Sequence, residues 1–157
     1  MAVSFECVTS SPRSASDMFD LARDIDVHTA SQSDSGERAT GGVTGGLIGW
    51  GETVTWKARH FGLPLSLTSR VTEFDAPHRF VDEQTRGPFR VFRHEHLFEP
   101  AGSASASSSD SDSGSVMTDR VQFTAPFGVV GRLVEKLVLE RYLRRLIEER
   151  GRFLAGR

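Results

Sequence analysis

Two histidines, His94 and His96, are separated by one residue in a stretch where polar and apolar side chains alternate. Successive side chains of a β-strand point to opposite faces, so both imidazoles are expected on one face of a strand at 89–99. Asp119 or Glu73, each in another predicted strand, could bring a carboxylate to this pair. Such a group of titratable side chains indicates either ligand binding or acid–base chemistry.

Three interpretations of the histidine pair stay open. Two histidines and a carboxylate can hold a divalent metal, as in non-haem iron sites, although this spacing is common by chance. A histidine whose tautomer is set by Asp119 can also act as a general base on an enolisable ligand. We adopt the third, in which one histidine is a hydrogen-bonded wall residue and the other lies in solvent near a strand end. We therefore expect no metal, no cofactor and no catalytic residue, with His94, His96 and Asp119 as the catalytic alternative.

Nucleophilic catalysis has little support in the sequence. The G-x-S-x-G motif does not occur, and the serines cluster at 103–115. Cys7 is the only cysteine and lies in a predicted strand without an adjacent base. It can form neither an internal disulfide nor a thiolate cluster, which fits a reducing, intracellular compartment.

Runs of β-branched and aromatic residues alternate with short turns along most of the chain. Strands joined this tightly must pair antiparallel, because a parallel return needs about a dozen residues. A helix is expected at 12–23, with one further turn at 25–28. The strands are expected at 3–9, 52–61, 63–75, 79–86, 89–99 and 116–124. Residues 103–115 contain eight serines and no apolar residue larger than alanine, so a flexible hairpin loop is expected there.

Residues 126–154 indicate one long C-terminal helix, for which Pro126 suits the entry and Gly156 the exit. Its apolar residues share one side up to Val138 and lie on the opposite side from Leu139 onward. This change predicts a kink near 138–140 or two halves that cover different surfaces. We expect a cavity entrance where residues 126–131 lead into this helix, close to the glycine-rich segment 41–51.

The inner faces of the predicted strands carry aromatic side chains and a few polar groups. This mixture suits a small-molecule pocket, in which apolar walls remove ligand surface from water and polar groups orient the ligand. Phenylalanines alone would fit a filled core equally well. The residues expected to line the pocket are Trp56, Leu65, Leu67, Phe80, Phe92, His94, His96, Asp119, Val121, Phe127, Val130 and Val134.

The order of these elements and three stretches of sequence resemble the START-like superfamily. More narrowly, the chain resembles the SRPBCC ligand-binding proteins, which include the polyketide cyclase/dehydrase and lipid-transport group. The stretches are EFDAPHRFVDEQTRGP at 73–88, FRVFRHEHLFEP at 89–100 and MTDRVQFTAPFG at 117–128. The resemblance covers about residues 3–155 and implies an α+β helix-grip fold. In that fold a curved antiparallel sheet of seven strands wraps around the C-terminal helix, with a cavity between them. The serine-rich loop is longer than the family leads us to expect.

Length and charge exclude several classes of protein. A chain of 157 residues fits one domain. A net charge of −2 provides no broad basic surface for nucleic acid. The sequence lacks a long apolar run and a leader pattern, so no stable membrane insertion is expected and a cytoplasmic location is favoured. Residues 127–157 carry eight Lys and Arg against four Asp and Glu, which leaves a homodimer or a protein partner open.

The favoured function is therefore binding or carriage of a small apolar molecule that is lipid-like, aromatic or polyketide-like, without catalysis. The first alternative is a cyclase, dehydratase or isomerase that uses His94 or His96 with a carboxylate. The second alternative is a protein-interaction module that acts through the basic C-terminal helix. The resemblance does not decide among them, because related folds host both carriers and catalysts.

Overall fold

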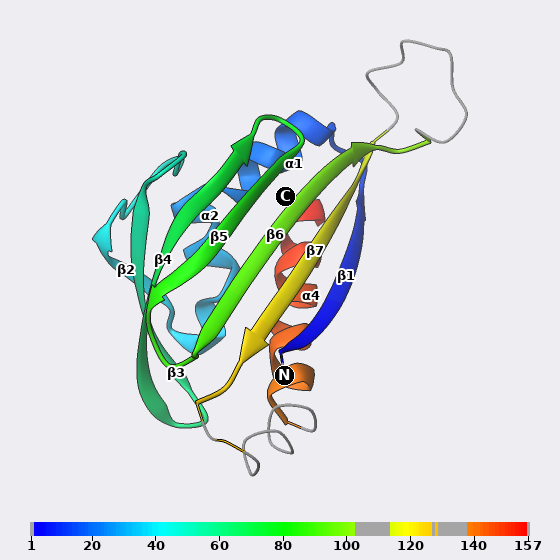
Figure 1. The fold of residues 1–157 in the computed structure, drawn as a ribbon. Coiled ribbons are helices and arrows are strands. Elements are labelled where there is room, and N and C mark those ends of the chain that lie inside the picture. Colours follow the sequence, from blue (N-terminus) through cyan, green and yellow to red (C-terminus); the bar gives the residue numbers. More distant parts are fainter. Residues whose placement is uncertain (1, 103–113, 127, 129–137, 157) are drawn as a thin grey trace.

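The computed structural model describes residues 2–102, 114–126, 128 and 138–156 (Figure 1). The strands are β1 (Val3–Ser11), β2 (Arg38–Gly42), β3 (Thr53–His60), β4 (Leu63–Asp75), β5 (Arg79–Arg86), β6 (Val91–Pro100) and β7 (Ser115–Thr124). The helices are α1 (Ala15–Ala22), α2 (Ile25–Ser31), a short 3-10 helix (Ser33–Ser35) and α4 (Glu140–Gly156). The serine-rich loop expected at 103–115 lies outside the described residues up to residue 113, and Ser115 begins β7.

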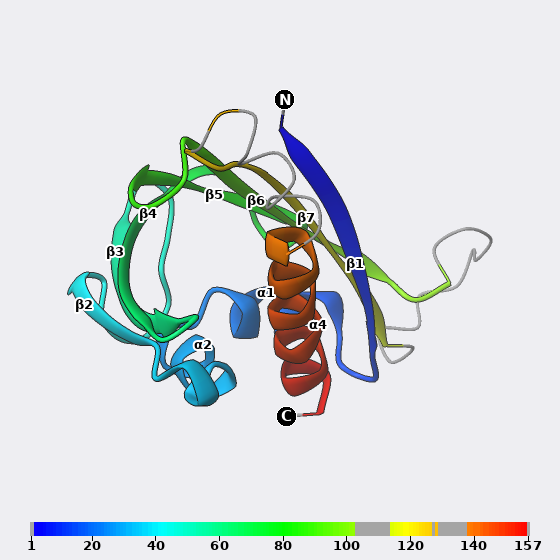
Figure 2. The ribbon, with the colours of Figure 1, turned by 90° about the horizontal axis from the view of Figure 1, so that it is seen from below.

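All seven strands belong to one antiparallel sheet with the order β1-β7-β6-β5-β4-β3-β2. The strands from β3 to β7 are neighbours in sequence order, and β1 pairs with β7 along the far edge. The sheet curves around α4, which lies on its concave side (Figures 1 and 2). The predicted α+β helix-grip architecture is therefore confirmed.

The two short helices α1 and α2 follow β1 and lie at the end of the sheet where α4 ends (Figure 1). Ser14 caps α1 by accepting a hydrogen bond from the Asp17 amide, and Asp24 caps α2 by accepting from two backbone amides. These caps explain why the first helix begins at Ala15 and not at residue 12. Met18 and Phe19 of α1 are fully buried and close this end of the interior.

Strand β2 was missed by the sequence analysis because its residues, RATGG, lack the β-branched and apolar alternation of a strand. Pairing with β3 creates this strand, with a register shift between Ala39 and Gly41. Gly42 has a φ of 69°, and a Cβ at this position would lie 2.1 Å from the backbone oxygen of Thr53. Only glycine fits this close approach of the two strands.

The C-terminal helix differs from its predicted span of 126–154. Residues 129–137 lie outside the described part, and α4 begins at Glu140 and extends to Gly156. Val138 and Leu139, directly before α4, have π-helical backbone. A π-helical turn is a common cause of a kink. It occurs here at the position where the apolar pattern changes side.

Helix α4 packs most closely on β1, at the edge of the sheet. Gly151 permits this approach, because a Cβ at this position would lie 2.2 Å from Oγ1 of Thr9 in β1. Leu154, one turn further along, is fully buried. The helix is thus held against one side of the concave sheet, and the other side stays open toward the interior.

Replacing Gly151 by alanine should therefore destabilise the protein. The steric conflict with Thr9 costs about 1–3 kcal/mol, which exceeds the roughly 1 kcal/mol that alanine contributes to a helix relative to glycine. Urea unfolding of G151A, T9A and the double variant measures the coupling. We expect T9A to recover part of the loss, and additive effects would contradict the contact. Gly156 is the control, since a Cβ there meets nothing within 4 Å.

Candidate ligand-binding site

A cavity of about 750 Å³ lies between the concave face of the sheet and the helices α1, α2 and α4. This volume is in the range of small-molecule sites. Strands β3 and β4 supply apolar side chains such as Trp56, Leu65 and Leu67, and α4 supplies Leu143 and Ile147 on the facing wall. The cavity exists because α4 covers β1 and leaves the concave side of β3 and β4 without a helix against it.

The cavity opens at the end of the sheet that contains the β3–β4 turn. Among the large apolar residues that line it, Phe61 and Leu63 at this turn and Val138 before α4 are exposed. Pro126 lines the cavity as well. Residues 127 and 129–131 of the predicted entrance lie outside the described residues, so an entrance at 126–131 stays a prediction.

The second part of the entrance prediction was wrong, because the glycine-rich segment 41–51 lies near the opposite end. The Ile25 amide donates to the carbonyl of Gly46, and the Ile48 amide donates to the carbonyl of Arg23. The segment therefore packs on the junction of α1 and α2, where Ile48 is buried in the core with Met18.

The predicted lining residues fall into three groups. Seven of them line the cavity: Trp56, Leu65, Leu67, Phe80, Phe92, His94 and His96. Asp119 and Val121 point to the same side of the sheet but are buried, Asp119 against the two histidines and Val121 against Phe5 and Cys7. Phe127, Val130 and Val134 lie outside the described residues. Contact of any of these residues with a ligand stays a prediction.

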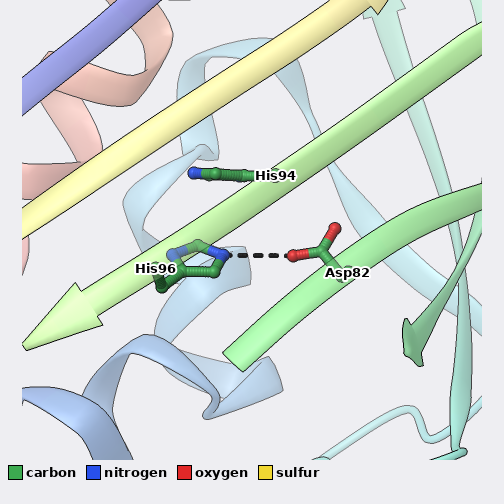
Figure 3. A group of neighbouring side chains, drawn as sticks. All are labelled: Asp82, His94 and His96. Atoms are coloured by element: carbon green, nitrogen blue, oxygen red, sulfur yellow. Dashed lines mark hydrogen bonds and ion pairs between the residues drawn. The ribbon is translucent and has the colours of Figure 1, made fainter. Parts of the chain in front are cut away.

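The polar centre of the cavity wall is a cluster of His94, His96, Asp82 and Asp119 from the three adjacent strands β5, β6 and β7. Nε2 of His94 lies 2.8 Å from Oδ1 of Asp119. Nε2 of His96 lies 3.1 Å from Oδ2 of Asp82 (Figure 3). Nδ1 of His96 is 2.8 Å from the same Asp119 oxygen but has no hydrogen bond of good angle. His96 therefore lies between two carboxylates.

The charges in this cluster follow from burial and from these contacts. Burial lowers the pKa of His94, and the neighbouring His96 lowers it further, which keeps His94 neutral near pH 7. Burial opposes a charge on His96 too, but its contacts with Asp119 and Asp82 outweigh burial and raise its pKa. Despite the opposing effect of burial, bonds from the histidines lower the pKa of Asp82 and of Asp119. The cluster thus favours protonation of His96, between two carboxylates, over protonation of His94.

Two expectations about this cluster were wrong. Neither histidine lies in solvent, since His94 is 5% and His96 1% exposed. Glu73 does not approach them, because a register shift between Val71 and Glu73 turns it outward, where it pairs with Arg79. The sequence analysis also did not recognise Asp82 as the second carboxylate, although alternation with Phe80 placed it on the inner face.

Within the described residues, one group could hold a metal ion. Asp82, His94 and His96 each offer one ligand atom, and these atoms lie within 4.8 Å of one another. However, the two imidazole rings overlap with centroids 3.8 Å apart, and Nε2 of His96 already bonds to Asp82. A hydrogen-bonded cluster accounts for these contacts, so the absence of a metal stays our prediction.

Two further polar pairs line the cavity. His28 stacks on Trp56 and is hydrogen-bonded to Glu37. Burial lowers the pKa of His28 more than this bond raises it. Near the opening, Nδ1 of His60 lies 2.6 Å from the hydroxyl of Tyr142. These pairs give an otherwise apolar wall several places where a polar group of a ligand could bind.

The curved sheet, the long C-terminal helix and the cavity between them define a protein of the helix-grip class. Solved structures share this fold over almost the whole chain. TTHA0849 from Thermus thermophilus is 16% identical with a TM-score of 0.72, and the match covers 99% of this chain and 95% of that one. The KanY protein is 20% identical with a TM-score of 0.72, over 99% and 97% of the two chains.

Norcoclaurine synthase from Thalictrum flavum, solved in complex with dopamine and hydroxybenzaldehyde, is 11% identical with a TM-score of 0.66. That match covers 99% of this chain and 88% of the synthase. No family model matches the sequence, and no curated protein matches it. At these identities the shared feature is the fold. No helix among the described residues is both long and apolar enough to cross a membrane.

The raised pKa of His96 predicts a pH-dependent effect of replacing Asp82 by asparagine. When a histidine has a higher pKa in the folded than in the unfolded protein, its protonated form stabilises the fold. This stabilisation is complete at pH values below the unfolded pKa of about 6.5, and it is lost as the pH rises through the folded pKa. D82N should therefore destabilise the ligand-free protein more at about pH 5.5 than at about pH 9.5. Denaturant unfolding at both pH values measures the loss in free energy of unfolding. D75N, which changes an exposed aspartate at the end of β4, is the control. Equal losses at both values would contradict a charged His96.

Proposed function

We propose that this protein binds a small apolar molecule in the cavity between the sheet and α4. The observation that carries the proposal is the cavity itself, about 750 Å³ with mostly apolar walls and an opening at one end. Protein interiors are close-packed and contain few voids larger than a water molecule. In a cavity of this size, an apolar ligand that replaces water against the apolar walls lowers the free energy of the protein.

The cluster of His94, His96 and Asp82 would orient such a ligand. The neutral His94 bonds to Asp119 through Nε2, and no described residue bonds to its Nδ1. Asp82 is partly accessible, and one of its two carboxylate oxygens bonds to His96. A ligand hydroxyl that donates to one of these acceptors would be fixed relative to the apolar walls. We therefore propose a ligand that is lipid-like, aromatic or polyketide-like and carries at least one polar group.

A catalytic role is the second candidate, and the His94–Asp119 hydrogen bond of 2.8 Å is the observation that favours it. Asp119 holds one nitrogen of a neutral imidazole, which leaves the other nitrogen able to take a proton from an enolisable ligand.

This acid–base role can be tested by hydrogen exchange. The protein would be incubated in deuterium oxide with the ligand that copurifies with it or with a cyclic aryl ketone, and deuterium uptake would be followed by mass spectrometry. The catalytic role predicts uptake that falls by a factor of about 10² or more in H94Q. Binding without uptake above the protein-free rate would leave the carrier role alone.

An interaction module acting through the basic helix has less support. On α4, Arg144 pairs with Glu140, and Arg145 pairs with Glu149. Such pairs four residues apart are typical of a solvated helix face. Arg144 and Arg145 therefore already have partners on the helix itself.

The binding function can be tested by filling the cavity. Ala58 of β3 lines the cavity, and its neighbour Lys57 is exposed on the other face of the sheet. We expect A58W to weaken binding of an uncharged apolar fluorescent dye by about tenfold or more, because the indole occupies ligand space. K57W should bind the dye like the wild type. Equal affinity of A58W and K57W for the dye would place the dye outside the cavity.

The natural ligand can be sought separately. Mass spectrometry of the denatured, freshly purified protein would identify a ligand that copurifies with it.

A further inference from the structure

Arg150 is a buried arginine that pairs with none of the described carboxylates. It is 5% exposed, lies in α4 and lines the cavity. Nη2 donates to the carbonyl oxygen of Ala22, whereas Nε is buried and has no hydrogen-bond partner among the residues that the structure describes. In the part of the chain that the structure describes, no carboxylate lies within ion-pair distance of this guanidinium. Other arginines of α4, such as Arg145 and Arg152, pair with glutamates on the surface.

An arginine remains charged at all accessible pH values, so its burial without an ion pair is costly. Removing such a charge from water without a partner opposes folding. Two carboxylates of the cavity wall, Glu37 and Asp82, do not pair with Arg150, because Glu37 is bonded to His28 and Asp82 to His96. They act on Arg150 only through space. A ligand anion could supply the missing partner.

Arg150 also lies deep in the cavity, far from its opening. Val138, at the opening, precedes Arg150 by twelve residues, which corresponds to about 18 Å along a helix. Between them, α4 presents Leu143, Leu146 and Ile147 to the cavity. The lining is thus arranged for an elongated molecule with an anionic end at Arg150 and an apolar body that extends toward the opening.

We propose that Arg150 binds the carboxylate of an amphipathic organic acid, which deepens and rests on the proposed ligand binding. The planar fork of a guanidinium matches a carboxylate, and the N–H groups that Ala22 does not use can form this pair. Glu37 and Asp82 repel further negative charge, so a monoanion is favoured over a dianion. The ligand class is therefore a monocarboxylic acid with a long or aromatic apolar part.

The test compares a fluorescent polyene fatty acid, cis-parinaric acid, with its uncharged methyl ester at about pH 8, where the acid is ionised. We expect the wild type to bind the acid at least tenfold more tightly than the ester. R150Q should lose this preference and keep its affinity for the ester. R145Q, which removes an exposed arginine of the same helix, should behave like the wild type. R150K, which keeps the charge but not the fork, should retain part of the preference.

The outcomes separate the two proposals. A wild type that binds acid and ester equally, or an R150Q that keeps the preference for the acid, overturns the role of Arg150 and leaves apolar ligand binding intact. Failure of the wild type to bind the acid, the ester or an uncharged apolar dye overturns the proposed function itself. Circular dichroism establishes that each variant is folded, and R150K decides the question if R150Q does not fold.

Discussion

The close contact between α4 and β1 determines the arrangement of the interior. Gly151 lets the helix approach Thr9, and α4 is thereby held at one edge of a sheet that curves away from it. Strand curvature carries most of the concave face of β3 and β4 away from the helix across the interior, although His60 at the end of β3 contacts Tyr142 of α4. The cavity follows from this off-centre packing of one helix, and α1 and α2 close one of its ends.

The polar groups in the cavity wall obey the rule that buried charges need partners. His96 lies between Asp82 and Asp119, and Glu37 bonds to His28, so these carboxylates each have a histidine beside them. Arg150 departs from this rule, and it does so in the cavity wall. An unpaired buried group in a folded protein marks a place where something outside the chain can contribute to stability.

Binding and catalysis would use the same geometry in this fold. A neutral His94 held by Asp119 can accept a hydrogen bond from a ligand hydroxyl or take a proton from a ligand carbon. The difference lies in the ligand, which must be acidic enough and held within hydrogen-bond reach for proton transfer. A carboxylate anchored at Arg150 would set how far along the wall the rest of the ligand extends, and hence which of its atoms meets His94.

Local sequence patterns were sufficient to predict the antiparallel meander from β3 to β7 and the inner faces of β6 and β7, because tight turns and alternation of period two are local properties. Alternation placed His94, His96 and Asp119 on one face. The same patterns could not place Glu73, which a register shift turns outward, or identify the β2 pairing, which depends on β3. The bond from His96 to Asp82 and the lack of a carboxylate beside Arg150 emerge only in the folded chain. Side chains that meet across a cavity come from segments far apart in the sequence. The periodicity within one strand or helix therefore cannot predict which charged groups contact each other there.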